Sequence, residues 1–285
     1  MGLIGWPVEH SLSPALHNAA FSELGLDWAY VPLPVRPGRV GDAVRGLRAL
    51  GFRGANVTIP HKAAVIPHLD WLERDATLAE AVNTIVVEEG GTLRGYDTDV
   101  VGFSRALEEA CGAGGRAPLA PGEPALILGA GGAARAAALV LARLGARLTV
   151  VNRSVERGER LAGLVAAALP GASVAVLPLD ALDGPLVQAQ RLLVNATALG
   201  MPGGHGGIAG AGKVPRALAD NLTAGQVVAD FVYTAGLTDL LAQAQAQGAT
   251  IVDGLSVLVW QAAAAFELWT GVPAPVEAMC RAVGR

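Results

Sequence analysis

The sequence predicts an α/β protein that is built from two domains. Short strand-like apolar runs alternate with stretches of helical periodicity along most of the 285 residues, which is the pattern of α/β folds. Apolar residues make up 52% of the chain, which is typical of parallel strands buried on both faces. A segment rich in glycine and proline at 112–124 interrupts the alternation and has the composition of a domain connection.

The bulk composition excludes several functional classes. Mean hydropathy is +0.43, but no uncharged run reaches the roughly 18–20 residues of a membrane-spanning helix. The net charge is −4 without a basic stripe, so we expect no nucleic-acid partner. Cys111 and Cys280 are too few for a disulfide framework, and the histidines lack metal-binding spacing, so no metal is expected. The N-terminus lacks signal-peptide features, and we expect a cytoplasmic protein.

Strand and helix signals follow each other through the N-terminal part. Apolar runs predict strands over residues 3–4, 28–35, 55–59 and 84–87. Ser13 followed by Pro14 has the composition of a helix N-cap with proline in the first turn. We therefore predict a helix over residues 15–24.

The second part repeats the same alternation. Strands are predicted over residues 125–128, 148–151, 173–177, 192–195, 227–230 and 250–252. Helices are predicted over residues 131–144 and 255–269, and Gln261 is a polar residue within the apolar run of the second helix. Residues 203–212 are rich in glycine, so we expect a mobile loop there.

Residues 129–134 read GAGGAA and satisfy the GxGxx(G/A) pattern of dinucleotide-binding turns. The motif directly follows a predicted strand and opens a predicted helix, which is the context that the pattern requires. Glycine permits the tight turn and lets backbone N–H groups approach a pyrophosphate, and the helix N-terminus adds a partial positive charge. The sequence therefore predicts a Rossmann-type nucleotide-binding domain.

The end of the next strand distinguishes NADP from NAD. NAD sites usually place a carboxylate there for the ribose 2′-hydroxyl. This strand instead runs into Asn152, Arg153 and Ser154, and Arg157 follows one turn later. Because a guanidinium group pairs well with a 2′-phosphate, the sequence favours NADP as the cofactor.

Lys62 and Asp99 are candidates for proton transfer. Lys62 follows a predicted strand that Pro60 interrupts, and Asp99 follows another strand in the segment GYDTD. Reduction of a carbonyl by hydride needs a proton donor beside the developing alkoxide. A lysine can serve if desolvation brings its pKa toward neutrality, and a carboxylate can orient it. Spacing alone does not establish that the two residues meet.

Further motifs extend the pattern over nearly the whole chain. They are HSLSP at 10–14, NVTIPHK at 56–62, AVNT at 81–84, GYDTD at 95–99, GAGGA at 129–133, NRS at 152–154, NAT at 195–197 with GM at 200–201, and DGL at 253–255. In this order they resemble the shikimate dehydrogenase (NADP+) family. The SxSP and NVTxPxK elements are far more specific than the glycine motif.

The resemblance implies an enzyme that reduces 3-dehydroshikimate to shikimate with NADPH. It implies that Lys62 is the catalytic acid and base and that Asp99 is its partner. The implied substrate-binding residues are Ser11, Ser13, Thr58, Asn83, Tyr233 and Gln261. The implied cofactor-binding residues are Gly129, Ala130, Gly131, Gly132, Ala133, Asn152, Arg153, Ser154, Arg157, Thr197, Met201, Val232 and Gly254.

The resemblance also implies the domain organisation. Residues 1–101 would form the substrate-binding domain and residues 102–253 the Rossmann-type NADP-binding domain. The C-terminal helices, residues 254–285, would return to the first domain. We expect a monomer or a homodimer that acts on a small molecule.

One position departs from the family pattern. The family commonly has Asn-Thr-Asp where this chain has Asp97, Thr98 and Asp99. A second carboxylate facing inward would raise the pKa of Asp99 or Lys62. We expect Asp97 to point away, and its effect on a pH profile stays open because alternation is irregular at strand ends.

The sequence leaves three alternatives open. A quinate or dual quinate/shikimate dehydrogenase differs by one ring hydroxyl of its substrate, and Ser13 and the strand tip without a carboxylate favour shikimate and NADP. A catalytically silent ligand-sensing homologue is disfavoured because Lys62 and Asp99 are both present. A methylene-tetrahydrofolate dehydrogenase lacks support from the pair Ser11 and Ser13.

Overall fold

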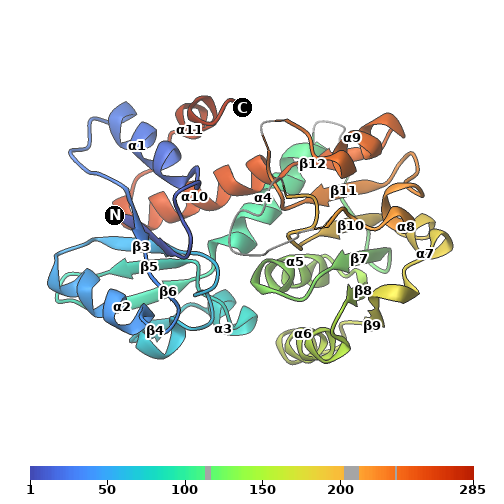
Figure 1. Cartoon of the computed structure of the whole chain (residues 1–285), viewed down its shortest axis with the longest axis horizontal. Coiled ribbons are helices and arrows are strands. Elements are labelled where there is room, and N and C mark those ends of the chain that lie inside the picture. The colour runs from blue at the N-terminus through green and yellow to red at the C-terminus, as the bar shows by residue number, and fades with distance from the viewer. Residues whose placement is uncertain (113–116, 202–211, 235) are drawn as a thin grey trace. The chain divides into compact units, whose positions relative to one another are not determined.

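The structure is a computed structural model that describes residues 1–112, 117–201, 212–234 and 236–285. Residues 203–211 of the glycine-rich segment expected to be mobile therefore lie outside the described residues. The described chain forms two compact units (Figure 1). The first comprises residues 1–102 and 258–285, and the second comprises the described residues between 103 and 257. Across the described ranges, no helix combines the length and apolarity needed to cross a bilayer.

The first unit contains a six-stranded mixed sheet in the order β2-β1-β3-β5-β6-β4. The strands are β1 (Gly2–Gly5), β2 (Val31–Pro34), β3 (Gly54–Val57), β4 (Trp71–Leu72), β5 (Thr84–Val87) and β6 (Leu93–Tyr96). Strands β1 and β3 are parallel, whereas β5 is antiparallel to both β3 and β6. The carboxyl ends of β1, β3 and β6 and the amino end of β5 therefore lie at one edge of this sheet.

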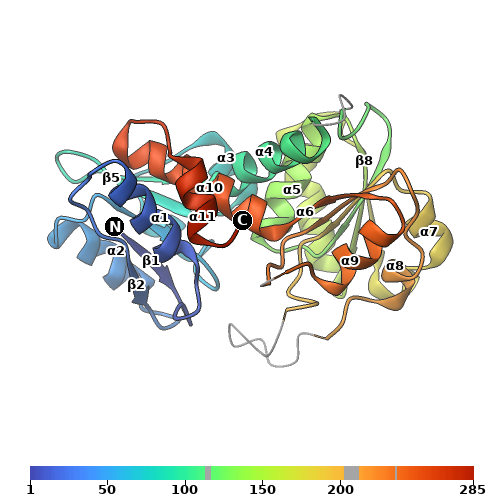
Figure 2. The same cartoon turned by 90° about the horizontal axis from the view of Figure 1, so that it is seen from above.

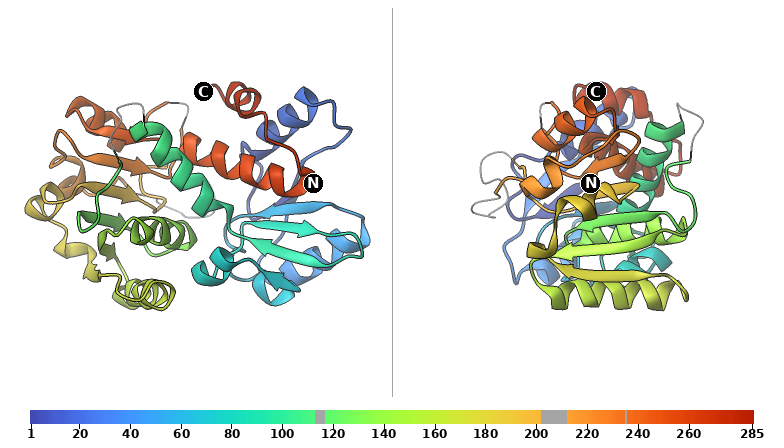
Figure 3. Two further views of the ribbon diagram at one scale, coloured as in Figure 1. Left: turned by 180° about the vertical axis from the view of Figure 1, so that it is seen from behind. Right: turned by 90° about the vertical axis from the view of Figure 1, so that its right-hand side faces the viewer.

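Helices cover both faces of the first sheet. They are α1 (Ser13–Glu23), α2 (Val40–Ala49), η1 (Ile66–His68), α3 (Arg74–Ala79), the start of α4 (Thr98–Gly112), most of α10 (Gly254–Thr270) and α11 (Val276–Ala282). One core packs α2 against Ile4, Val57 and Ile85. The other packs α1 against the C-terminal helices (Figures 2 and 3). Phe21, Phe266 and Met279 are buried in this core.

The C-terminal helices thus pack on the first unit, as the resemblance implied. The indole Nε1 of Trp269 on α10 donates a 2.9 Å hydrogen bond to the carbonyl oxygen of Ile85 on β5. Gly54 makes room for this contact, because a Cβ at that position would lie 2.3 Å from the same Nε1 atom.

The second unit contains a six-stranded, all-parallel sheet in the order β12-β11-β10-β7-β8-β9. The strands are β7 (Pro124–Leu128), β8 (Arg147–Asn152), β9 (Val174–Pro178), β10 (Leu192–Asn195), β11 (Val227–Asp230) and β12 (Thr250–Val252). Counted from β7, this is the Rossmann order 3-2-1-4-5-6 read from the other edge. The strand order reverses between β7 and β10, which is where such folds bind nucleotides.

Helices flank this parallel sheet on both faces. Figure 1 shows α5 (Gly132–Arg143) and α6 (Val155–Ala168) on one face. The other face carries α7 (Gly184–Gln188), α8 (Arg216–Ala219) and α9 (Asp239–Ala246), with η2 (Leu179–Ala181) preceding α7. Leu126, Leu193 and Val228 bury their side chains under these helices, and this burial accounts for the high apolar content of the strands.

Two local expectations were wrong. Ser13 is the first residue of α1 rather than its cap; Leu12 is the N-cap, and the Ser13 hydroxyl contacts Ser11 Oγ instead. The strand expected over 28–35 is shorter, because β2 spans only Val31–Pro34. Asn18 binds both the N–H and the carbonyl of Tyr30, at 2.8 and 2.9 Å, and so occupies backbone groups that a longer strand would use.

The segment at 112–124 does not divide the two compact units. The division falls at 102/103 and 257/258, inside α4 and α10, because both helices run from one unit into the other. The described residues of the glycine- and proline-rich segment belong to the second unit.

Candidate active site

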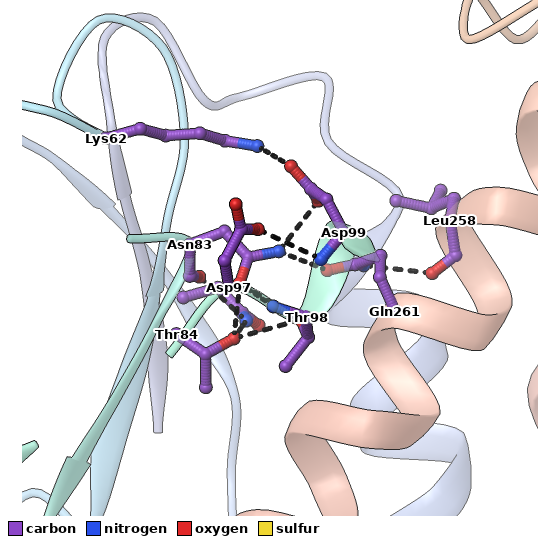
Figure 4. A network of polar contacts seen from close by, with 9 residues as sticks. Lys62, Asn83, Thr84, Asp97, Thr98, Asp99, Leu258 and Gln261 are labelled. Atoms are coloured by element: carbon purple, nitrogen blue, oxygen red, sulfur yellow. Dashed lines mark hydrogen bonds and ion pairs between the residues drawn. The ribbon is translucent and has the colours of Figure 1, made fainter. Parts of the chain in front are cut away.

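Lys62 and Asp99 are in contact, which spacing alone could not establish. Lys62 lies in the loop after β3, and Asp99 lies in the first turn of α4, which follows β6. Lys62 Nζ forms an ion pair with Asp99 Oδ2 (Figure 4). The side chains are 21% and 13% exposed, so this pair is largely withdrawn from water while still reachable.

Asn83 holds the other oxygen of Asp99. Its Nδ2 donates to Asp99 Oδ1 at 2.7 Å, and its Oδ1 accepts from the backbone N–H of Thr98 at 2.8 Å. Because a backbone N–H can only donate, the second contact determines which way the amide is oriented. Asn83 Nδ2 also approaches Gln261 Oε1 at 3.4 Å, and Gln261 Nε2 donates to the carbonyl of Leu258 at 2.9 Å.

A buried polar layer beneath Asn83 was missed by sequence reasoning. The hydroxyl of Tyr30 donates to Asn56 Oδ1 at 2.7 Å. Asn56 Nδ2 in turn donates to the carbonyl of Asn83 at 3.1 Å and to Thr84 Oγ1 at 2.9 Å. Asn56 and Thr84 stood inside recognised motifs and could have been singled out, whereas Tyr30 stood in no motif.

The remaining substrate-side candidates of the first unit lie at the same sheet edge. Ser11 and Ser13 follow β1, and their hydroxyl oxygens are 3.2 Å apart. Thr58 directly follows β3, and its N–H donates to the carbonyl of Ile4 at 2.8 Å. Tyr233 is different, because it belongs to the second unit, after β11, where burial raises its pKa.

Lys62 does not have the lowered pKa that desolvation alone would give it. Burial lowers its pKa, but the negative charges of Asp99 and Asp97 and the hydrogen bond to Asp99 outweigh burial. The pKa of Lys62 therefore lies above its ordinary value. The ammonium form is the resting form, which suits donation of a proton to a developing alkoxide.

Asp97 does not point away from the site, as we had expected. Its Oδ1 accepts a 3.1 Å hydrogen bond from the N–H of Asp99, so it caps the start of α4. The carboxyl group turns to the same side as Lys62 and Asp99 (Figure 4). Strand alternation ends at Tyr96, because a capping side chain must fold back toward the helix amides.

The glycine turn of the second unit has the geometry of a phosphate-binding loop. Gly129 follows β7 with φ of +113°, a conformation that favours glycine, and a Cβ there would lie 3.0 Å from Thr197 Cγ2. Gly131 is the N-cap of α5 and faces open space. The N–H groups of Gly132 and Ala133 open the helix, so this terminus can bind an anion.

The tip of β8 carries the residues expected at a 2′-phosphate. Asn152 Nδ2 donates to the carbonyl of Ser154 at 2.8 Å, which tightens the turn. Ser154 caps α6 by accepting from the N–H of Arg157 at 3.3 Å. The side chains of Arg153 and Arg157 are exposed, and guanidinium groups in such a position fit a phosphate.

Asp230, at the end of β11, connects the loops on the other side of the strand reversal. It accepts from Asn195 Nδ2 at 2.9 Å, from the N–H of Val232 at 3.1 Å and from Thr238 Oγ1 at 2.7 Å. Asn195 Oδ1 in turn accepts from Thr197 Oγ1 at 2.6 Å. Sequence reasoning missed this carboxylate, although its place at a strand end was a usable signal.

Gly254 and Met201 are two further residues that the sequence assigned to the cofactor. A Cβ on Gly254 would lie 2.6 Å from the carbonyl oxygen of Val232, so only glycine fits. Met201 is partly buried, and its N–H donates to the carbonyl of Ala198 at 3.1 Å. Within the described ranges, no three His, Cys, Asp or Glu side chains gather as metal ligands.

Comparison with known proteins finds relatives along nearly the whole chain. Residues 3–85 match the family model of the shikimate dehydrogenase substrate binding domain, and residues 254–283 match that of the shikimate 5'-dehydrogenase C-terminal domain. A shikimate dehydrogenase (NADP(+)) of Methanopyrus kandleri is 46% identical, over 99% of this chain and 94% of the relative.

Solved structures share the fold over nearly the full length. A crystal structure of shikimate dehydrogenase in complex with NADP+ is 40% identical with a TM-score of 0.86, covering 99% of this chain and 93% of that one. Quinate dehydrogenase from Corynebacterium glutamicum in complex with NAD has a TM-score of 0.87 at 32% identity, covering 99% and 96%. The backbone alone therefore does not separate the two activities, whereas sequence identity favours the first.

Proposed function

The chain belongs to the shikimate dehydrogenase (NADP+) family, and from this premise we propose the catalytic and binding roles of its residues. Its activity is the NADP-dependent interconversion of 3-dehydroshikimate and shikimate. The observation that carries the assignment of roles is the contact of Lys62 with Asp99, which Asn83 holds from the other side. Bound NADPH supplies the hydride.

Lys62 supplies the proton in the reducing direction. Its ammonium group transfers a proton to the carbonyl oxygen as the carbon accepts the hydride, which leaves a neutral amine. Asp99 orients the ammonium group and stabilises its charged form. In the oxidising direction the amine of Lys62 accepts the hydroxyl proton.

Neutral donors and acceptors bind the substrate. We assign Ser11 and Ser13 to the carboxylate of the substrate, and Thr58, Asn83 and Gln261 to its ring hydroxyls. We also assign Tyr233 to the carboxylate end of the substrate. A site built to hydrogen-bond hydroxyl groups rejects ligands that lack them, because its buried polar atoms would stay unpaired.

The second unit binds the cofactor. The turn from Gly129 to Ala133 takes the pyrophosphate at the N-terminus of α5. Asn152, Arg153, Ser154 and Arg157 take the 2′-phosphate. The remaining contacts along the nucleotide come from Thr197, Met201, Val232 and Gly254. On this assignment the first unit is the substrate domain and the second is the nucleotide domain.

The location and the partners of the enzyme complete the proposal. The enzyme works in the cytoplasm as a monomer or homodimer on a small-molecule substrate. The acidic net charge of −4 without a basic stripe supports the absence of nucleic-acid partners.

Steady-state kinetics with shikimate or quinate, each with NADP+ or NAD+, test the function. We expect the highest kcat/KM for shikimate with NADP+. The absorbance of the reduced cofactor reports the rate. Quinate with NAD+ is the competing pair, because a relative named as a quinate dehydrogenase shares the fold. Faster turnover of quinate with NAD+ would overturn the choice of both substrate and cofactor.

A further inference from the structure

Asp97 carries a buried oxygen that its local role does not explain. The residue is 3% exposed. Its Oδ1 caps α4, but its Oδ2 has no hydrogen-bond partner within the described residues. Asparagine serves a helix N-cap as well as aspartate does, so capping alone does not require a carboxyl group here.

The charges around Asp97 decide which form the carboxyl group takes. Three titratable side chains act on it: Asp99 from α4, Lys62 from the loop after β3, and Asp75 from α3. With both Asp97 and Asp99 ionised, one ammonium group would face two buried carboxylates. A buried charge with an unpaired oxygen is costly, whereas a proton on Asp97 leaves Lys62 and Asp99 as a neutral pair.

The electrostatic balance points the same way as the geometry. Burial raises the pKa of Asp97 well above its ordinary value, and the charge of Asp99 raises it further. The positive charge of Lys62 and the hydrogen bond from the N–H of Asp99 oppose this rise without cancelling it. Two neighbouring carboxylates that share a site commonly hold one proton between them.

We propose that Asp97 is a positioning residue that carries a proton in the resting site, and that its ionisation strengthens the hold of Lys62 on its own proton. Asp97 acts through Lys62 and does not touch the reacting atoms. As the pH rises, Asp97 ionises first, and its negative charge then opposes loss of the proton from Lys62. The kinetic part of this proposal rests on the proposed function.

Infrared spectroscopy of the full-length protein without ligand tests the proton on Asp97. At neutral pH we expect a carboxylic-acid C=O stretching band in the wild type that Asp97→Asn removes. The matched control is Asp183→Asn, because Asp183 is an exposed N-cap of α7 that accepts from the N–H of Leu186 at 2.8 Å. The control should retain the band.

The pH profile of shikimate oxidation tests the link to Lys62. Oxidation needs the amine of Lys62, so kcat/KM rises with pH as the ammonium group loses its proton. In Asp97→Asn no second negative charge forms, and this rise should move to lower pH. Asp183→Asn should superimpose on the wild type.

The outcomes separate the two proposals. If the wild type lacks the carboxylic-acid band, or if Asp97→Asn retains it, the proposal that Asp97 is protonated is wrong. Superimposable pH profiles of Asp97→Asn and the wild type overturn its effect on Lys62. Failure of the wild type and of both variants to oxidise shikimate would count against the proposed function. Loss of the band in Asp97→Asn would still support the proton on Asp97.

Discussion

Asn83 donates a 2.7 Å hydrogen bond from its Nδ2 atom to Oδ1 of Asp99, while Oδ2 of the same carboxylate pairs with Lys62. The amide cannot flip without losing the hydrogen bond from the N–H of Thr98 to its oxygen. The carboxylate is therefore held at both oxygens, and Lys62 meets a partner of fixed orientation. This arrangement makes the lysine the first target for substitution.

Replacing Lys62 by alanine should lower kcat by about 10²–10⁴, the usual contribution of a positioned proton donor. Shikimate should still bind, because hydroxyl and amide groups hold it, and calorimetry measures that binding directly. Lys213→Ala is the control, since Lys213 is exposed and is the only other lysine in the sequence. Unchanged turnover in Lys62→Ala would refute its role as the acid.

Alanine substitutions at Gly129 and Gly131 should affect different properties, stability in the first case and cofactor binding in the second. Gly131→Ala should retain stability to within about 1 kcal/mol, because its φ of −85° and open surroundings accept a Cβ. It should raise the KM for NADP+, because the Cβ occupies space needed for the pyrophosphate. An unchanged KM for NADP+ would contradict a phosphate site there.

Gly129→Ala is the matched comparison. Its φ of +113° and a contact of 3.0 Å with Thr197 Cγ2 strain any side chain. We expect a loss of at least about 1–2 kcal/mol in the free energy of unfolding, measured by urea denaturation. Equal stability of the two variants would show that the turn tolerates a Cβ at both positions.

Arg153→Glu should reverse the preference for NADP+ over NAD+. A carboxylate at the tip of β8 repels the 2′-phosphate and can accept a hydrogen bond from the ribose 2′-hydroxyl. The measurement is kcat/KM for each cofactor at saturating shikimate. Arg160→Glu, at an exposed position farther along α6, should leave the ratio unchanged. If Arg153→Glu behaves like this control, the NADP assignment of the strand tip is wrong.

Asp230 should make stability depend on pH. Burial raises its pKa to about 6, although hydrogen bonds from Thr238, Val232 and Asn195 oppose the rise. In an unfolded chain the pKa of aspartate is about 3.9. The folded state therefore binds the proton more tightly, and stability is greatest below about pH 4 and falls as the pH rises through about 6.

Asp230→Asn removes this titration. Relative to the variant, the wild type should lose on the order of 2 kcal/mol in the free energy of unfolding between about pH 4 and 7. Urea midpoints across this range measure the difference, and the exposed Asp239→Asn is the control. A constant difference between Asp230→Asn and the wild type across that range would contradict the raised pKa.

Tyr30→Phe should destabilise the layer beneath Asn83. The substitution removes the donor to Asn56 Oδ1 and leaves a buried acceptor unpaired, which costs about 1–3 kcal/mol. Tyr96→Phe is the control, because Tyr96 is only partly buried, and its effect should stay within about 0.5 kcal/mol. Equal stability of the two variants, measured by urea unfolding, would contradict a structural role for the Tyr30 hydroxyl.

Local patterns predicted the regular elements well where side chains alone determine them. The strands β5, β10, β11 and β12 have the predicted bounds, because each is an apolar run ended by turn or polar residues. Prediction failed where a distant side chain intervened. Asn18 shortens β2 by binding the backbone of Tyr30, and no local pattern around residues 28–35 carries that information.

The sequence by itself determined the fold class, the glycine turn and the identity of the paired charges, because motifs record which residue types follow which strand. Only the tertiary structure decided how these residues meet. Asp99 pairs with both Lys62 and Asn83, and Asp97 turns inward. Which groups share a proton depends on burial and on distances between segments far apart in the chain, and spacing along a sequence encodes neither.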